Sequence, residues 1–121
     1  LDKVGLGGMG NRSGHHFSAG QKRAAAIATI LAMSPSIITM DEPDASLDPR
    51  NRDKILSILH NLKQTLVIAT CNMDFVAKLC SRAVLIDKGR IVADGNVSDL
   101  LSDEKLMNAH GLETPRSLSQ R

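Results

Sequence analysis

The chain has 121 residues, 42% of them hydrophobic, and a formal net charge of +2 at pH 7. Its length and apolar content suit one domain with its own core. The small charge and the two aromatic residues, Phe17 and Phe75, argue against a nucleic-acid partner. No apolar run approaches the roughly 18 residues of a membrane span. No signal peptide is apparent, and Cys71 and Cys80 lack a metal or redox spacing, so a reduced cytosolic setting is expected.

The stretch GLGGMGNR at residues 5–12 contains four glycines, which raises the question of a phosphate-binding loop. The glycines fit G-x-G-x-x-G, but no strand precedes them and no helix start follows. In a P-loop the last glycine is followed by lysine and by serine or threonine, whereas this chain has Asn11 and Arg12. The sequence instead favours a helix that ends at Val4, with Gly5 as its left-handed cap.

Hydrophobic periodicity then alternates between helix and strand along the chain. The expected elements are helices at 18–33, 48–62, 73–80 and 97–109, strands at 36–40 and 65–70, a hairpin at 82–95, and a polar, disordered tail at 111–121. Both strand runs are almost continuously apolar, as buried parallel strands are. This order predicts an α/β fold with a mainly parallel sheet flanked by helices and a late antiparallel hairpin.

The first candidate site is HHFSAGQKR, at the start of the helix at 18–33. Ser18 followed by Gln21 is a capping box, in which each side chain satisfies a free backbone N–H group. The same helix start also makes an anion site, because unpaired N–H groups and the helix dipole face outward. Ala19 and Gly20 would leave room for a phosphate to approach. Both interpretations remain open at this point.

The second candidate site is IITMDEPDASLDP, where a strand ends in Asp41 and Glu42. Ligands of open α/β folds bind at the carboxyl edge of the sheet, where these carboxylates are expected. Neighbouring strand residues point opposite ways, so one carboxylate can hold magnesium while the other orients and deprotonates a water. The alternative is a turn whose Asp and Pro residues only end the strand.

A third polar segment, VIATCNMD, follows the strand at 65–70 and is expected at the same sheet edge. Cys71 in this segment is either a functional group or a small buried hydrophobe, as free cysteines often are. His15 and His16 do not complete a metal site with it, since no third ligand has a suitable spacing. We expect the remaining polar groups to be solvent-exposed, namely His60, His110, Arg50, Arg52, Asp53 and Lys54.

Together these segments resemble the C-terminal half of ABC-type ATPase domains. FSAGQ resembles the signature motif, usually LSGGQ; SIITMDE resembles Walker B; SLDP resembles the D-loop; and DKGRIVADG resembles the hairpin that follows. The resemblance runs from about Leu1 to His110, which we take as a partial ABC ATPase domain at 1–110. The HH pair and AMSPSIITMDEPDASLDPR are most similar to ATPase subunits of cobalt/nickel and energy-coupling-factor importers.

The resemblance implies ATP and Mg²⁺ as cofactors. It also implies a second ABC ATPase subunit, which would hold the ATP that the signature motif contacts. The implied roles are in-trans nucleotide binding by Ser18, Ala19, Gly20 and Gln21, Mg²⁺ binding by Asp41, general-base catalysis by Glu42, a D-loop at the dimer interface formed by Ser46, Leu47 and Asp48, and γ-phosphate sensing at Cys71.

The sequence departs from the family pattern at several points. The family's switch residue is histidine, and a cysteine thiol is a weak donor with an unperturbed pKa of about 8.5, so Cys71 predicts impaired hydrolysis. Ala19 replaces a signature glycine but keeps its backbone N–H. The 121 residues contain no P-loop lysine, magnesium-binding Ser/Thr or Q-loop glutamine. We therefore expect no complete nucleotide site, exposed sheet edges and apolar faces, and a poorly soluble or oligomeric isolated chain.

The resemblance implies an ATP-hydrolysing subunit of an ABC-type importer, bound peripherally at the cytoplasmic face of the membrane to integral membrane subunits. The first alternative is a degenerate half-domain that binds or regulates without turnover. The second is a non-transport ABC ATPase of the DNA-repair or translation type. Its near-neutral charge and importer-like hairpin argue against that second alternative.

Overall fold

The computed structural model describes residues 2–8, 10 and 17–118. The chain divides into two compact units, Leu1–Ala69 and Thr70–Arg121. Within the described residues, no helix has both the length and the apolar character needed to cross a membrane. A parallel strand pair lies in the first unit and an antiparallel hairpin in the second, so the predicted α/β class is confirmed.

The first unit is a helix–strand–helix–strand segment preceded by a short helical turn. Its elements are η1 (Asp2–Val4), α1 (Ala19–Ala32), β1 (Ile37–Asp41), α2 (Pro49–His60) and β2 (Thr65–Ala69). The predicted helix end at Val4 is confirmed, and Gly5 follows it with the left-handed φ of +71° that a glycine cap adopts. The histidine pair at 15–16 and residues 9, 11 and 12 of the glycine-rich stretch lie outside the described residues.

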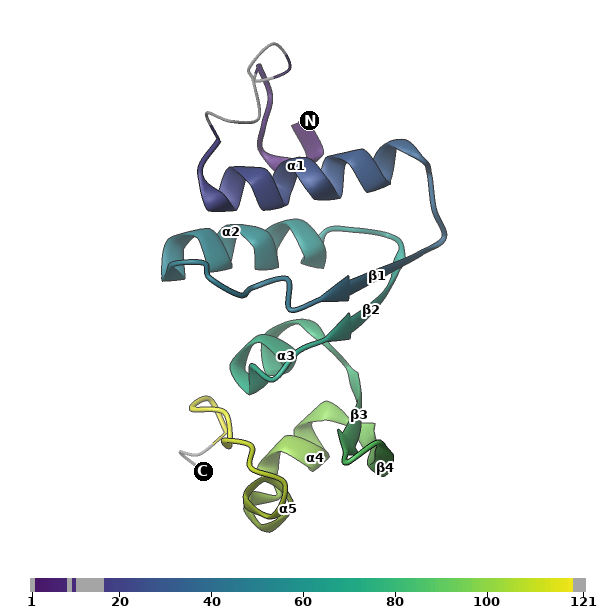
Figure 1. The fold of residues 1–121 in the computed structure, drawn as a ribbon, viewed down its shortest axis with the longest axis vertical. Helices are drawn as coiled ribbons and strands as arrows, with labels where there is room; N and C mark the ends of the chain where they lie inside the picture. Colours follow the sequence, from purple (N-terminus) through teal and green to yellow (C-terminus); the bar gives the residue numbers. More distant parts are fainter. Residues whose placement is uncertain (1, 9, 11–16, 119–121) are drawn as a thin grey trace. The chain divides into compact units, whose positions relative to one another are not determined.

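Local signals set the ends of both long helices. The Ser18 side chain accepts a hydrogen bond from the N–H of Gln21 at the start of α1, and Asp48 caps α2 with Pro49 at its first position. After α1 the chain reverses at Ser34, whose φ is +52°, and Pro35 prevents the helix from continuing. The two helices lie side by side (Figure 1) and pack against each other.

Strands β1 and β2 pair in parallel, from Ile37 opposite Thr65 to Asp41 opposite Ala69. The sequence suggests strands buried on both faces, but only alternate residues turn away from solvent. On the outward face Ile37 is 60% and Val67 56% exposed. These values agree with the expectation that the sheet exposes apolar surface. The opposite face contributes Ile38 to the core.

The core of the first unit forms from the apolar faces of both helices and from segments that flank them. Residues three and four positions apart on α2 share one helix face, which explains the burial of Ile55 and Leu59. The remaining buried apolar side chains of this unit are Val4, Leu6, Ala24, Ile27, Ile38, Leu47 and Leu56. Burying each large side chain contributes about 1.5–3 kcal/mol relative to leaving it exposed.

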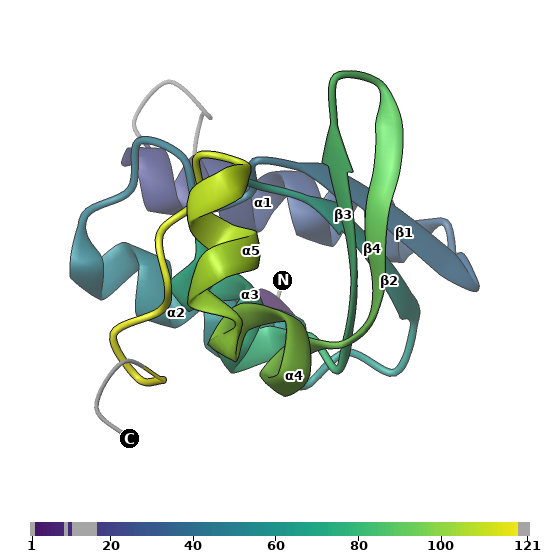
Figure 2. The same ribbon diagram turned by 90° about the horizontal axis from the view of Figure 1, so that it is seen from below.

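The second unit contains α3 (Met73–Leu79), β3 (Arg82–Asp87), β4 (Arg90–Asn96), α4 (Val97–Ser102) and α5 (Glu104–Ala109). Strands β3 and β4 form the predicted hairpin (Figure 2). Lys88 and Gly89 both have positive φ, +49° and +74°, as a two-residue type I′ turn requires. Arg82 and Asp94 join the strands through two hydrogen bonds of 2.9 and 2.8 Å.

The sequence predicts one helix over 97–109, but the structure contains two. Asp103 ends α4 and caps α5, because its carboxylate accepts a hydrogen bond from the N–H of Leu106. The break lets both helices contribute to one buried cluster, formed by Val97, Leu101 and Met107. Asx side chains at a helix start compete with helix continuation in this way.

Residues 112–118, which the sequence assigns to a disordered tail, lie against the second unit. Pro115 is fully buried, and Leu112 and Leu118 pack on the buried cluster of this unit. The N–H of Arg116 donates a hydrogen bond of 3.1 Å to the carboxylate of Asp74. This stretch therefore has specific contacts in the structure, although a domain boundary at residue 110 stays a prediction.

His110, expected to be solvent-exposed, is instead partly buried. Its Nδ1 lies 2.7 Å from the Asp87 carboxylate, and the two side chains are only 20% and 33% exposed. This contact joins the end of α5 to the end of β3, 23 residues away in sequence. His60 is exposed, as predicted.

Candidate functional site

The start of α1 has the capping-box geometry that the sequence predicts. The Ser18 hydroxyl accepts a hydrogen bond of 3.2 Å from the N–H of Gln21, and the Gln21 side chain accepts one of 3.0 Å from the N–H of Ser18. Ser18 and Ala19 are exposed. The helix start therefore presents backbone N–H groups and the positive end of the helix dipole at an accessible surface, which favours anions.

Gly20 differs from the sequence interpretation, in which its small size leaves room for a ligand. It is buried, and a Cβ placed on it would lie 2.5 Å from Oδ1 and 2.6 Å from Cγ of Asn51 on α2. Asn51 is held there by Asp48, to which its side-chain amide donates a hydrogen bond of 2.9 Å. The missing side chain of Gly20 thus makes room for α2 of the same chain.

A cavity of about 390 Å³ borders the start of α1. Ser18, Gly20 and Gln21 line one part of it, and Lys54 of α2 lines another. The lysine ammonium and the start of α1 both give the cavity a positive character. The rest of the lining is mainly apolar, with contributions from η1 and the buried face of α2.

The two predicted acidic residues lie at the carboxyl end of β1. Asp41 is the last strand residue and is exposed, whereas Glu42 is half-buried and its N–H donates a hydrogen bond of 2.8 Å to the carbonyl of Ala69. Glu42 has a left-handed φ of +45°, so the strand direction ends abruptly there. A non-glycine residue in this conformation is uncommon and is often found at functional sites.

The predicted D-loop residues follow in a compact turn. Ser46 is exposed and has a φ of +61°, Leu47 is 7% exposed, and Asp48 caps α2 through a hydrogen bond of 2.8 Å from the N–H of Asn51. We call residues Glu42–Leu47 the acidic turn. Two of its six residues are left-handed without being glycine.

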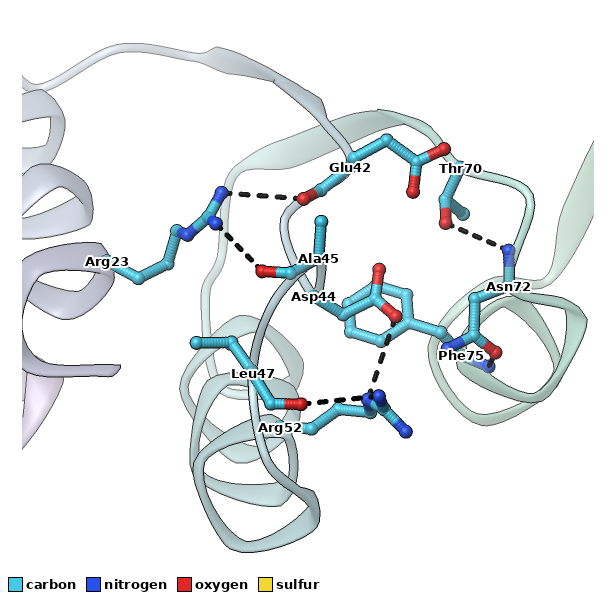
Figure 3. Close-up of polar contacts among 9 residues, drawn as sticks. All are labelled: Arg23, Glu42, Asp44, Ala45, Leu47, Arg52, Thr70, Asn72 and Phe75. Carbon is cyan, nitrogen blue, oxygen red and sulfur yellow. Dashed lines mark hydrogen bonds and ion pairs between the residues drawn. The ribbon is translucent and has the colours of Figure 1, made fainter. Parts of the chain in front are cut away.

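Two arginines hold the acidic turn from different helices (Figure 3). Arg23 of α1 donates hydrogen bonds of 3.4 Å to the Glu42 carbonyl and 3.2 Å to the Ala45 carbonyl. Arg52 of α2 donates one of 3.4 Å to the Leu47 carbonyl, and its Nε lies 3.8 Å from the carboxylate of Asp44, which is 4% exposed. Fork-shaped guanidinium groups suit such paired acceptors.

Cys71 belongs to the second unit, in the turn that leads into α3. The sequence interpretation of a small buried hydrophobe is wrong, because Cys71 is exposed. Next to it, the Thr70 hydroxyl accepts a hydrogen bond of 3.1 Å from the N–H of Asn72 (Figure 3), and the Asn72 side chain caps α3. Cys80, by contrast, is half-buried, and burial raises the pKa of its thiol.

Sequence reasoning missed the residues that join the predicted segments. The sequence interpretation places Arg52 on a solvated helix start; its side chain is 38% exposed but also contacts Leu47 and Asp44. The sequence interpretation assigns no role to Arg23, Asp44 or Asn51. The available signal is charge: an arginine one turn into α1 and a second acidic residue, Asp44, two positions after Glu42. Among the described residues, no three His, Cys, Asp or Glu side chains gather into a metal site.

The chain is similar to known proteins in sequence and in structure. A family model described as "AAA domain, putative AbiEii toxin, Type IV TA system" matches residues 3–72, which is more than half of the chain. A Streptomyces avermitilis protein named "Putative ABC transporter ATP-binding protein" is 41% identical over the whole chain, which covers 46% of that protein. "Energy-coupling factor transporter ATP-binding protein EcfA" of Methanothermobacter thermautotrophicus is 36% identical, over 97% of this chain and 39% of its own length.

A solved structure supports the same fold assignment. CbiO1 from Clostridium perfringens, described as part of the ABC transporter complex CbiONQ, superposes with a TM-score of 0.79 at 30% identity. The match covers 98% of this chain and 49% of CbiO1, so the chain spans about half the length of such relatives. The fold is α/β and matches part of the P-loop domain of this ABC transporter structure. The chain belongs to the ABC transporter ATP-binding family.

Proposed function

We propose that this chain is part of an ATP-binding and ATP-hydrolysing subunit of an ABC-type membrane importer, of the cobalt/nickel or energy-coupling-factor class. The carrying observation is the acid pair at the end of β1, with exposed Asp41 followed by Glu42 in a left-handed conformation. EcfA is named as an energy-coupling factor transporter protein and CbiO1 as part of the ABC transporter complex CbiONQ, which supports the energy-coupling-factor class. Partner ATPase and membrane subunits, and a peripheral place at the cytoplasmic face, belong to the same proposal.

The start of α1 would bind the γ-phosphate of an ATP held mainly by a second ATPase subunit. Ser18 and the backbone N–H of Ala19 are exposed enough to meet it, while Gln21 holds the Ser18 backbone in place. Gly20 contributes by letting α2 pack closely, so that the helix start stays accessible at the surface. Ser46, Leu47 and Asp48 would lie at the interface with that subunit.

At the nucleotide site of this subunit, Asp41 would bind Mg²⁺ and Glu42 would act as the general base. Mg²⁺ in ATPase sites uses one or two carboxylates together with substrate phosphates, and the single exposed carboxylate of Asp41 fits that requirement. When bound, the ion neutralises charge that develops on the phosphates. Glu42 would accept the proton of the attacking water, and Cys71 would stand where the family has a γ-phosphate-sensing histidine.

A non-hydrolysing binding or regulatory role is the alternative that Cys71 favours. An exposed thiol is a weak hydrogen-bond donor and would stabilise a phosphate poorly in place of an imidazole. The two functions differ in turnover rather than in nucleotide binding. A measurement of hydrolysis therefore separates them.

The test is a chimera of the Streptomyces avermitilis relative in which the segment matched by this chain is replaced by this chain. We expect the chimera to bind ATP and, with Cys71→His added, to hydrolyse it. Adding Glu42→Gln should lower turnover about 100-fold or more while ATP binding persists. Glu104→Gln, at an exposed position of α5, is the matched control and should change nothing.

Two results would count against hydrolysis as the function. The Glu42→Gln change could leave turnover as it was, which would remove Glu42 as the base. A folded chimera that binds ATP without any turnover, even with Cys71→His, would support the non-hydrolysing role. Circular dichroism of each variant establishes that it is folded.

A further inference from the structure

The backbone of the acidic turn is held both from within and from outside, where the Glu42 N–H donates a hydrogen bond of 2.8 Å to the Ala69 carbonyl. Within it, the N–H of Ala45 donates to the Glu42 carbonyl at 3.1 Å, and the N–H of Leu47 donates to the Asp44 carbonyl at a long 3.4 Å. Left-handed residues such as Glu42 and Ser46 persist where the surrounding structure holds them. The contacts that surround this turn therefore decide the orientation of the Glu42 backbone.

Arg23 supplies two of those contacts from outside the turn. Its guanidinium donates to the carbonyls of Glu42 and Ala45, the residues on either side of Pro43 and Asp44 (Figure 3). The Ala45 carbonyl and the Ala45 N–H thus take part in one small network with Glu42. Arg52 contacts the other half of the turn, but its helix follows the turn directly in sequence.

Arg23 links the start of α1 to the acidic turn, because it lies on the same helix as the capping box. Arg23 lies two residues after Gln21, the last member of the capping box, on the same rigid helix. Its acceptors are 19 and 22 residues away in sequence. A shift of the helix start relative to β1 would therefore change the hydrogen bonds of Arg23 to the Glu42 and Ala45 carbonyls.

We propose that Arg23 is a positioning residue that couples the start of α1, with its Ser18–Gln21 phosphate-facing groups, to the backbone conformation of Glu42. The effect of Arg23 on catalysis rests on the proposed function. In that function, Ser18–Gln21 contact an ATP held by the second subunit, and Glu42 is the general base for the ATP bound by this subunit. Arg23 then makes the geometry of one nucleotide site depend on occupancy of the other.

The structural part is tested in the chimera by amide hydrogen exchange, because the isolated chain is expected to be poorly soluble or oligomeric. Arg23→Gln removes the charge and the fork geometry, and should raise exchange at the Ala45 and Leu47 amides about tenfold, with α3–α5 unchanged. Arg23→Lys keeps one donor group and the charge, so its exchange rates at these amides should lie between those of the wild type and of Arg23→Gln. Lys22→Gln, at the exposed neighbouring position, is the matched control and should match the wild type. Equal exchange in wild type and both Arg23 variants would overturn the proposal.

The functional part uses the chimera that carries Cys71→His. Arg23→Gln should lower kcat about tenfold or more with little change in KM for ATP, and Arg23→Lys should restore part of the loss. An unchanged kcat would refute the coupling to catalysis. If the parent chimera has no turnover, the proposed function fails, while the exchange comparison still decides whether Arg23 holds the acidic turn. Should Arg23→Gln not fold, Arg23→Lys carries both comparisons alone.

Discussion

Replacing Gly20 by alanine should weaken the packing of α1 against α2. The added methyl group would lie 2.5 Å from Oδ1, 2.6 Å from Cγ and 3.0 Å from Cβ of Asn51. Asn51 cannot swing away freely, because its side-chain amide and its backbone N–H both donate hydrogen bonds to the Asp48 carboxylate. Either the two helices separate or the cap of α2 is disturbed.

The expected cost follows from two opposing effects. Overpacking of a well-packed contact costs typically about 1–3 kcal/mol. Alanine gains at most about 1 kcal/mol over glycine in a helix interior, and less at the second position of a helix. We therefore expect a net loss of about 1–2 kcal/mol in the free energy of unfolding. Urea denaturation of the chimera, followed by circular dichroism, measures it.

A double-mutant cycle tests the cause of this loss. Asn51→Ala removes the two closest atoms, so Gly20→Ala should cost about 1 kcal/mol less in that background. Gly95→Ala is the matched control, since a Cβ there would meet only Leu100, at 4.0 Å. A Gly20→Ala variant as stable as wild type, or an equal cost in both backgrounds, would show that Asn51 is not the reason for the glycine.

Three further outcomes are expected. In the ATPase chimera, Cys71→His should raise turnover about tenfold or more, because imidazole is a better donor to phosphate than a thiol; no gain in the steady-state rate would contradict this. Iodoacetamide should label exposed Cys71 well before half-buried Cys80, whose raised pKa leaves less thiolate, and equal labelling of both by mass spectrometry would speak against it. Hydrogen bonds from Arg82 lower the pKa of Asp94, so its contribution to stability exists at neutral pH and is lost as the pH falls through that lowered value, below the ordinary 3.8. The stability difference between wild type and Asp94→Asn should accordingly shrink on acidification, and a difference independent of pH would refute the assignment.

The sequence predicts the parts of the site that short-range chemistry determines. Ser18 and Gln21 form their capping box within four residues, and Asp41 follows an apolar run that ends where the turn residues begin. Such features depend on neighbours in sequence, so periodicity and cap chemistry suffice to find them. The α/β class follows from the order of these segments for the same reason.

The contacts that join the segments were not predictable in the same way. A surface arginine and an arginine that holds a turn look alike in sequence, so the sequence assigns no such contact to Arg23 or Arg52. His110 and Asp87 pair across 23 residues, which no local pattern reports. Pro43 disfavours a right-handed helical conformation for Glu42, but it does not select the left-handed one that the structure shows.

The left-handed backbone of Glu42 lowers the stability of the fold at the residue that we assign as the catalytic base. At a φ of +45°, glycine would relieve a strain of about 1–3 kcal/mol, and asparagine part of it. A screen that selects variants of this chain for thermal resistance alone would therefore enrich glycine or asparagine at position 42. Such a screen would remove the carboxylate that we assign to catalysis, so stabilised versions of this chain should be built with position 42 held fixed.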